Sequence, residues 1–337
     1  MREGTMKTIS TALITAIAIQ LGSASITQAE TLKISTFLPP QHAFNRALRA
    51  WGEELSEKSE GDLTVEIFPA GQLGPPPRQF DLVRSGGADV SVVLHGATPG
   101  RFPLSELAGL PLVAPSAGSE SATTSRRLTE LAQEYLADEH AGTRVLWMAV
   151  TPPLMFHVHG FKPQDLSNFE GKRIRYAGAV WQKVIEALGA SPVPVPPAET
   201  ADAMGKGIVD GATFPFEATI PFDLAPVSEY TLTPGIAGAT FSVIIGDHAY
   251  LRLSDEHKAL IDETTGPDRA ADFGALWDEG EVRGRAYMEE GGVEVVALKE
   301  VALEQLRAKL YGVVSNFIQD ADAKGIPASA FVDAYSK

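Results

Sequence analysis

Two short segments contain the side chains most able to bind a small molecule. The first is Gly171-Lys172-Arg173-Ile174-Arg175-Tyr176, and the second is 207–212, which leads into Thr213-Phe214-Pro215-Phe216-Glu217. Arg175 can hold a carboxylate through two parallel hydrogen bonds, because a planar guanidinium matches two carboxylate oxygens. Aromatic side chains after the second segment can cover the apolar part of the same molecule. The two segments together predict a site for an organic anion.

Arg173 and Arg175 both qualify for this role. Adjacent side chains of a strand face opposite ways, so the two arginines share one face and Ile174 lies on the other. Alternation therefore does not decide between them. The alternative for either one is a surface arginine paired with an acidic neighbour.

The sequence between the segments predicts how they are brought together. It reads as strand, helix, strand, helix and strand over 172–176, 180–188, 192–195, 199–206 and 208–209. Such alternation indicates parallel strands joined by right-handed crossovers, and Gly189 suits the left-handed cap of the first helix. Ligands of open α/β sheets bind beyond the carboxyl ends of strands. Arg175 lies near one such end and residues 213–217 follow another.

Short motifs along nearly the whole chain resemble a known family in their order and spacing. They are Ile34-Ser35-Thr36-Phe37, Gly71-Gln72-Leu73-Gly74, Leu188-Gly189-Ala190 and the segments 60–69, 83–90, 99–106, 110–111 and 165–175. Together they resemble the periplasmic solute receptors of tripartite ATP-independent periplasmic (TRAP) transporters, the DctP-like substrate-binding proteins.

The resemblance implies both a fold and a function. The fold is α/β and of the periplasmic-binding-protein type, with two lobes of mixed sheets, an interlobe cleft and a long C-terminal bracing helix. The implied function is to bind an organic acid in the cleft and deliver it to the membrane permease subunits of a TRAP transporter, without catalysis and without a cofactor. In this family the arginine of a Lys-Ile-Arg-Val type strand binds the ligand carboxylate, and motif position transfers that role to Arg175.

The second segment departs from the family pattern. Many members carry Gln-Glu-Asn-Pro after Val-Asp-Gly, and this chain has Ala212-Thr213-Phe214-Pro215 instead. A phenyl ring in place of an amide loses hydrogen bonds and gains apolar contact surface. We therefore expect Phe214 to contact a ligand less polar than a sugar acid or a small dicarboxylate. The alternative is that Phe214 or Phe216 fills a domain core.

Five further residues are candidates for ligand contact, each with an alternative. Phe37 follows the first strand and could instead pack in the core, and His95 follows a buried strand and could instead cap a loop. Trp181 could form an apolar wall or pack within the second lobe. Glu217 could accept a hydrogen bond from a ligand hydroxyl or ammonium group, although its charge would repel a bound carboxylate. His157 lies near the predicted crossing between lobes, where it could bond the ligand or instead have an ordinary structural or surface role.

His157 and His159 also allow a rival hypothesis. On a strand they would share a face and could chelate zinc or copper, as in a secreted metal-dependent hydrolase with an acidic third ligand. No recognised metal spacing accompanies them, and the chain has no cysteine, nucleophile elbow or phosphate-binding loop. We therefore expect no enzyme and no metal site. A second alternative is a ligand-sensing protein that serves a signalling receptor.

The first 29 residues read as an export signal, with Arg2 and Lys7 before an apolar stretch and cleavage near Ala29. Its removal changes the net charge from −15 to −16, because residues 1–29 carry Arg2, Glu3 and Lys7. An acidic surface argues against nucleic acids and anionic membranes as partners. We expect a periplasmic protein that does not insert into the membrane once the signal is removed.

The mature length suits two lobes. We expect lobe one to comprise 30–152 plus 241–280, with strands near 32–34, 65–67, 90–94, 145–150 and 241–245. Lobe two comprises 153–240 plus 281–337 and includes the bracing helix. An apolar stripe of Leu306, Leu310, Val313 and Phe317 identifies that helix.

Overall fold

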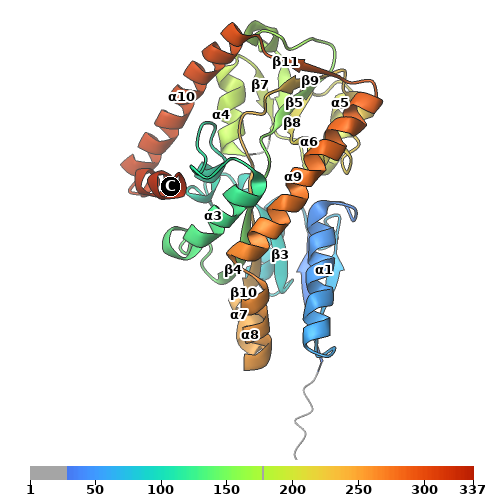
Figure 1. Ribbon diagram of the computed structural model, residues 1–337, viewed down its shortest axis with the longest axis vertical. Coiled ribbons are helices and arrows are strands. Elements are labelled where there is room, and N and C mark those ends of the chain that lie inside the picture. Colours follow the sequence, from blue (N-terminus) through green and yellow to red (C-terminus); the bar gives the residue numbers. More distant parts are fainter. Residues whose placement is uncertain (1–28, 177) are drawn as a thin grey trace, which may run out of the picture.

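The computed structural model describes residues 29–176 and 178–337 and arranges their strands in two sheets, one in each half of the molecule (Figure 1). This confirms the predicted two-lobed α/β fold. We call the half around the first sheet lobe one and the half around the second sheet lobe two. The predicted export signal lies almost entirely outside the described residues.

Lobe one is built on a five-stranded sheet of order β2-β1-β3-β10-β4. Its strands are β1 (Glu30–Ser35), β2 (Leu63–Phe68), β3 (Val90–Leu94), β4 (Thr143–Val150) and β10 (Thr240–Gly246). The first three are parallel, and β10 runs antiparallel between β3 and β4. All five strands predicted from apolar runs are present. β3 and β10 are buried along their whole length, which is why their sequences are mostly apolar.

Lobe two is built on a six-stranded sheet of order β11-β9-β5-β8-β6-β7. Its strands are β5 (Met155–Val158), β6 (Arg173–Arg175), β7 (Ser191–Val193), β8 (Gly211–Phe214), β9 (Tyr230–Thr233) and β11 (Glu294–Ala297). β6 lies parallel to both β7 and β8, which confirms the predicted crossovers.

One strand of this motif begins later than predicted. Residues 208–209 do not form it, because Ile208 still belongs to the turn that closes the preceding helix. Gly207 has a φ of +65°, and the Ile208 N–H donates to the carbonyl of Ala203 at 2.8 Å. The strand starts only at Gly211, so Thr213 and Phe214 lie within it at its carboxyl end.

Helices cover both sheets and connect the lobes. They are α1 (Ala43–Lys58), α2 (Gln79–Arg84), α3 (Ser121–Tyr135), α4 (Ala179–Ala187), α5 (Thr200–Gly205), α6 (Phe216–Thr219), α7 (Asp247–Arg252), α8 (Asp255–Thr264), α9 (Pro267–Glu290), α10 (Glu300–Ala323) and α11 (Ala328–Tyr335). The predicted apolar stripe lies on α10, which packs against α4 and leads to α11 on the surface of α3. The C-terminal helices thus touch both lobes.

The longest connection between the lobes is α9 (Figure 1). It packs against α3 and β4 in lobe one and against α6 and β11 in lobe two. The predicted lobe boundary between residues 280 and 281 falls inside this continuous helix. Two shorter crossings run side by side, since the Thr151 N–H donates to the Ala239 carbonyl at 2.9 Å and the Leu154 N–H to the Ala237 carbonyl at 2.8 Å.

The contact between α9 and α6 depends on glycine. A Cβ atom at Gly284 would overlap the carbonyl oxygen of Phe216, and one at Gly280 would lie 2.8 Å from Cβ of Glu217. These two glycines are one helical turn apart and let α9 approach the backbone of α6 directly. They therefore set the position of the segment that carries Glu217.

We expect Gly284→Ala to lower the free energy of unfolding by about 1–3 kcal/mol, the usual cost of overpacking a rigid contact. Gly312 in α10 is the matched control, because it is exposed and a Cβ there meets no atom within 4 Å. Gly312→Ala should raise stability by up to about 1 kcal/mol through helix propensity. Urea unfolding measures both, and equal stabilisation by the two variants would contradict the close approach of α9 and α6.

Candidate functional site

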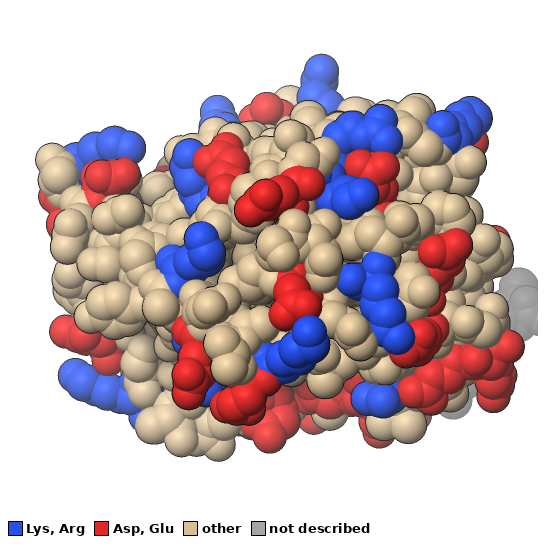
Figure 2. Space-filling view, turned by 90° about the horizontal axis from the view of Figure 1, so that it is seen from above, with Lys and Arg blue, Asp and Glu red and all other residues tan. Residues whose placement is uncertain are grey.

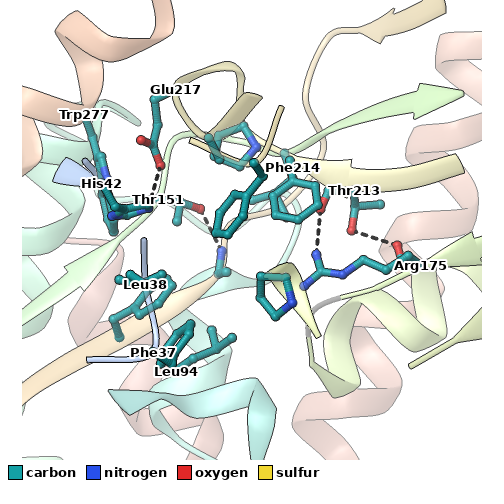
Figure 3. Close-up of a pocket in the computed structure, with 17 residues that line it drawn as sticks. Phe37, Leu38, His42, Leu94, Thr151, Arg175, Thr213, Phe214, Glu217 and Trp277 are labelled. Atoms are coloured by element: carbon teal, nitrogen blue, oxygen red, sulfur yellow. Dashed lines mark hydrogen bonds and ion pairs between the residues drawn. The ribbon is translucent and has the colours of Figure 1, made fainter. Parts of the chain in front are cut away.

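A small pocket of about 40 Å³ lies between the two lobes. Lobe one contributes Phe37 and Leu38 after β1, His42 before α1, Leu94, and Phe241 from β10. Lobe two contributes Arg175, Thr213 and Phe214 at strand ends, and Glu217, Ala218 and Phe222 from the segment around α6. The crossing residues Thr151 and Ala239 and the α9 residue Trp277 complete the walls. Figure 3 shows Arg175 and Thr213 on one side of Phe214, and His42, Glu217 and Trp277 on the other.

Arg175 is a buried cation without a counter-ion. Its residue surface is only 2% exposed. Nε donates to the Val195 carbonyl at 3.0 Å and Nη1 to the Thr213 carbonyl at 3.1 Å. Among residues 29–176 and 178–337, no carboxylate lies within 4.0 Å of its guanidinium. Burial lowers the pKa of Arg175 to about 9, which leaves it positively charged at neutral pH.

The structure separates the two arginines of β6. The Arg173 side chain is 46% exposed and forms a bidentate pair with Asp210, with Nε–Oδ2 at 3.1 Å and Nη2–Oδ1 at 2.7 Å. Arg173 is therefore the surface arginine paired with an acidic neighbour, and Arg175 is the arginine that lines the pocket. Strand alternation alone did not distinguish the two.

Phe214 forms the apolar wall beside the cation. The Cζ atom of Arg175 lies 4.3 Å from the centre of the Phe214 ring, within cation–π range. The Phe222 ring also packs against the Phe214 ring, and the two centroids are 5.3 Å apart. Aromatic side chains from β10 and α9 face the same space. The pocket thus combines one positive charge with a largely aromatic lining, to which Phe214 and Phe37 both belong.

His42 and Glu217 provide the polar groups at the other side of Phe214. His42 Nε2 lies 3.9 Å from Glu217 Oε1, and the two side chains are 4% and 6% exposed. Burial and, secondarily, the charge of Glu281 raise the pKa of Glu217 to about 8. Burial and the nearby Arg46 lower the pKa of His42 to about 3. Both side chains are therefore neutral near pH 7.

Three predicted contact residues lie away from the pocket walls. Both ring nitrogens of His95 are bonded within lobe one, Nδ1 to Thr240 Oγ1 at 2.9 Å and Nε2 to Ser242 Oγ at 3.1 Å. Trp181 is fully buried and packs its edge against Phe156, with centroids 5.6 Å apart. His157 lies behind the pocket, where it supports Phe214.

His157 does not form a metal site with His159. Its Nδ1 bonds Thr231 Oγ1 at 2.9 Å and its Nε2 bonds the Phe214 carbonyl at 3.1 Å, which occupies both nitrogens. His159 follows the end of β5 with a side chain 57% exposed, beside Glu229. No group of three or more metal-ligating side chains is found among the described residues. The metal-dependent hydrolase hypothesis is therefore wrong.

Sequence reasoning missed much of the lobe-one wall. His42, Phe241 and Trp277 line the pocket but are far from Arg175 in sequence. His42 lies seven residues after the last residue of β1, in the loop beyond the carboxyl end of a parallel strand. That placement was a usable signal for His42. Nothing comparable marks Trp277, which lies in the middle of a long helix.

A second cavity is also lined by Arg175. Prolines line much of it, from Pro75–Pro77 in lobe one and from Pro194, Pro196 and Pro197 in lobe two. Arg175 thus lies between the aromatic pocket and this proline-lined extension of the interlobe space.

Comparisons with known proteins agree with this geometry. The profile of the bacterial extracellular solute-binding proteins, family 7 (DctP), matches residues 34–320. A marine metagenome TRAP solute-binding protein, solved with 3-hydroxybenzoate, is 30% identical with a TM-score of 0.86, over 91% of this chain and 97% of that one. In the described part of the chain, no helix has the length and apolarity needed to cross a membrane.

Two further solved structures are similar to the same extent. One is a TRAP solute-binding protein of Bordetella bronchiseptica with bound mandelate, 30% identical with a TM-score of 0.84, over 91% of this chain and 97% of that one. The other, from Rhodoferax ferrireducens, contains copurified benzoate and is 26% identical with a TM-score of 0.85, over 91% of this chain and 96% of that one.

The raised pKa of Glu217 predicts a pH-dependent stability that Glu217→Gln removes. Between its ordinary value of 4.5 and about 8, the carboxyl keeps its proton in the folded state and loses it on unfolding. The contribution of Glu217 to the free energy of unfolding is therefore complete below about pH 4.5 and is lost as pH rises through about 8. The ionisable groups that face Glu217 are His42, just before α1, Arg46 within α1, and Glu281 of α9.

We expect wild type to lose more stability than Glu217→Gln between about pH 5 and pH 8. Urea unfolding at several pH values measures the difference between the two proteins. Parallel curves would mean that Glu217 is already ionised in the folded state.

Proposed function

This chain belongs to family 7 of the bacterial extracellular solute-binding proteins, and we propose that it binds an aromatic monocarboxylate between its lobes for delivery to a TRAP-type permease. The observation that carries the proposal is the buried guanidinium of Arg175, which has no carboxylate partner in the described structure and faces an aromatic pocket. A buried charge is costly unless it is paired, and a bound carboxylate supplies the pair.

The lining of the pocket favours an aromatic ligand. A ring held by its carboxylate at Arg175 would lie among Phe214, Phe222, Phe241 and Trp277. Aromatic pairs contribute about 0.5–1.5 kcal/mol beyond the area that they bury. The solved relatives with hydroxybenzoate, mandelate and benzoate support this ligand class.

Binding in this pocket requires the lobes to close, since both contribute walls. Glu106 of lobe one accepts a hydrogen bond from the Ala179 N–H at the start of α4 in lobe two, at 3.1 Å. Opening and closing would bend the paired crossings near Thr151 and Ala239 and the long helix α9. We propose that the permease recognises the closed form. The family match and the TRAP neighbours favour transport over a sensing role.

We further propose that the protein acts in the periplasm, after cleavage near Ala29, as a receptor without enzymatic activity. The net charge of −15 is consistent with the absence of polyanion binding. Figure 2 shows acidic and basic side chains interspersed on one face, with acidic ones gathered along one edge. Arg175 is then a local attraction for an anion within an acidic protein.

We expect Arg175→Ala to weaken binding of benzoate by at least about tenfold, because it removes charge-assisted hydrogen bonds worth about 1.5–3 kcal/mol. Arg173→Ala is the matched control on the same strand, since its partner is Asp210 on the surface. Calorimetry on ligand-stripped protein gives both affinities, with circular dichroism to confirm folding. Equal affinity of wild type and folded Arg175→Ala would overturn the proposal.

We expect Phe214→Leu to reduce the preference for benzoate over cyclohexanecarboxylate several-fold, because the ring contact is lost and the apolar volume is largely kept. Phe216→Leu is its control, since Phe216 packs against His157 rather than lining the pocket. Competition binding with the two acids measures the ratio. An unchanged ratio in Phe214→Leu would place the ring of the ligand elsewhere.

A further inference from the structure

The His42–Glu217 pair places polar side-chain atoms in the lining of the pocket. Both side chains are more than nine-tenths buried and line the pocket, and His42 Nε2 and Glu217 Oε1 are 3.9 Å apart. That distance is too long for a direct hydrogen bond. Within the described residues, neither His42 Nε2 nor the Glu217 carboxyl has a hydrogen-bond partner. Because both groups line the pocket, a polar group of a bound ligand can become their hydrogen-bond partner.

The chemistry of the two groups can be assigned from their surroundings. His42 Nδ1 accepts a hydrogen bond from the Phe44 N–H at 3.2 Å at the start of α1. In the neutral ring the hydrogen is therefore on Nε2, which faces Glu217 as a donor. The carboxyl of Glu217 has an oxygen that accepts in either protonation state. One donor and one acceptor thus lie side by side in the pocket.

The pair is held in place before any ligand arrives. The Glu217 N–H donates to Glu281 Oε1 of α9 at 2.8 Å, and the absence of a side chain at Gly280 lets α9 press against the Cβ of Glu217. His42 is fixed by its cap to Phe44 and by packing against Phe44 and Phe222. Groups held in this way lose little freedom on binding, which favours selectivity.

We propose that His42 and Glu217 bind a hydroxyl group on the ring of the aromatic acid whose carboxylate is held by Arg175. This inference rests on the proposed function and narrows its ligand class to hydroxylated aromatic monocarboxylates. A hydroxyl oxygen accepts from His42 Nε2–H and its hydrogen is donated to Glu217. Figure 3 shows the pair and Arg175 on opposite sides of Phe214, and all of these residues line the same pocket.

Other polar groups satisfy the pair less well. A second carboxylate would add a second negative charge to a pocket that already holds the carboxylate bound by Arg175, and an ammonium group has no lone pair to accept from His42. A hydrogen or methyl group in the same place would leave both buried groups without partners. The unsubstituted acid should therefore bind more weakly than the correct hydroxylated isomer.

The test compares benzoate with 3-hydroxybenzoate and 4-hydroxybenzoate by calorimetry on the ligand-stripped mature protein. We expect at least one hydroxylated acid to bind wild type about tenfold or more tightly than benzoate. Glu217→Leu should bring the affinity ratio close to one, and Glu217→Gln, which keeps a donor and an acceptor, should preserve most of it. The ratio cancels any general effect of a substitution on the pocket.

The outcomes separate this inference from the proposed function. If benzoate binds wild type and both hydroxylated acids bind no more tightly, the hydroxyl site is wrong and the carboxylate site stands. A hydroxyl preference that survives in Glu217→Leu would also overturn the assignment to this pair. If none of the three acids binds wild type, the proposed aromatic-acid function fails and the hydroxyl site fails with it.

Discussion

The site depends on the burial of the Arg175 guanidinium, which has no carboxylate partner among residues 29–176 and 178–337. Arg175 is surrounded by the carbonyl dipoles of Val195 and Thr213 and by the face of the Phe214 ring, and these interactions only partly replace water. A carboxylate at the same place would interact with the cation in a low-dielectric setting, where the attraction exceeds that in water. Closure of the lobes and capture of the anion therefore reinforce each other, because each makes the other more favourable.

The elements around Arg175 are arranged to present this charge at the boundary of the lobes. Three strands of lobe two converge behind Phe214, where His157 of β5 bonds Thr231 of β9 and the carbonyl of Phe214 in β8. The glycines of α9 then bring α6 against the helix that spans both lobes. The wall that carries Phe214 and Glu217 is thus rigid within lobe two, and the wall from lobe one can move relative to it only through the crossings and α9.

Local sequence patterns were sufficient for part of this arrangement. Helical spacing, terminal glycines and strand alternation predicted the β6–α4–β7–α5–β8 motif, and motif position identified Arg175, because these features depend on residues close in sequence. The histidines were harder to interpret, since an imidazole is equally suited to a ligand, a metal and a hydroxyl. The role of each histidine is decided by residues distant in sequence. Thr240 and Ser242 bond the ring nitrogens of His95, and Thr231 bonds one ring nitrogen of His157. Trp277 reaches the pocket through tertiary packing that no spacing encodes.

Burial lowers the pKa of Arg175 to about 9, which still leaves it charged, and burial also keeps Glu217 neutral. An ionised Glu217 would repel a ligand carboxylate within the same pocket, and the sequence alone gave this reason against a role in binding. Desolvation and the neighbouring Glu281 raise the pKa of Glu217 to about 8, so its proton is retained near pH 7. A bound carboxylate would favour that proton further, since a second negative charge disfavours ionisation. The pocket then presents a single net positive charge to an anion, although the chain as a whole is acidic, and Glu217 is free to act as a neutral hydrogen-bonding group.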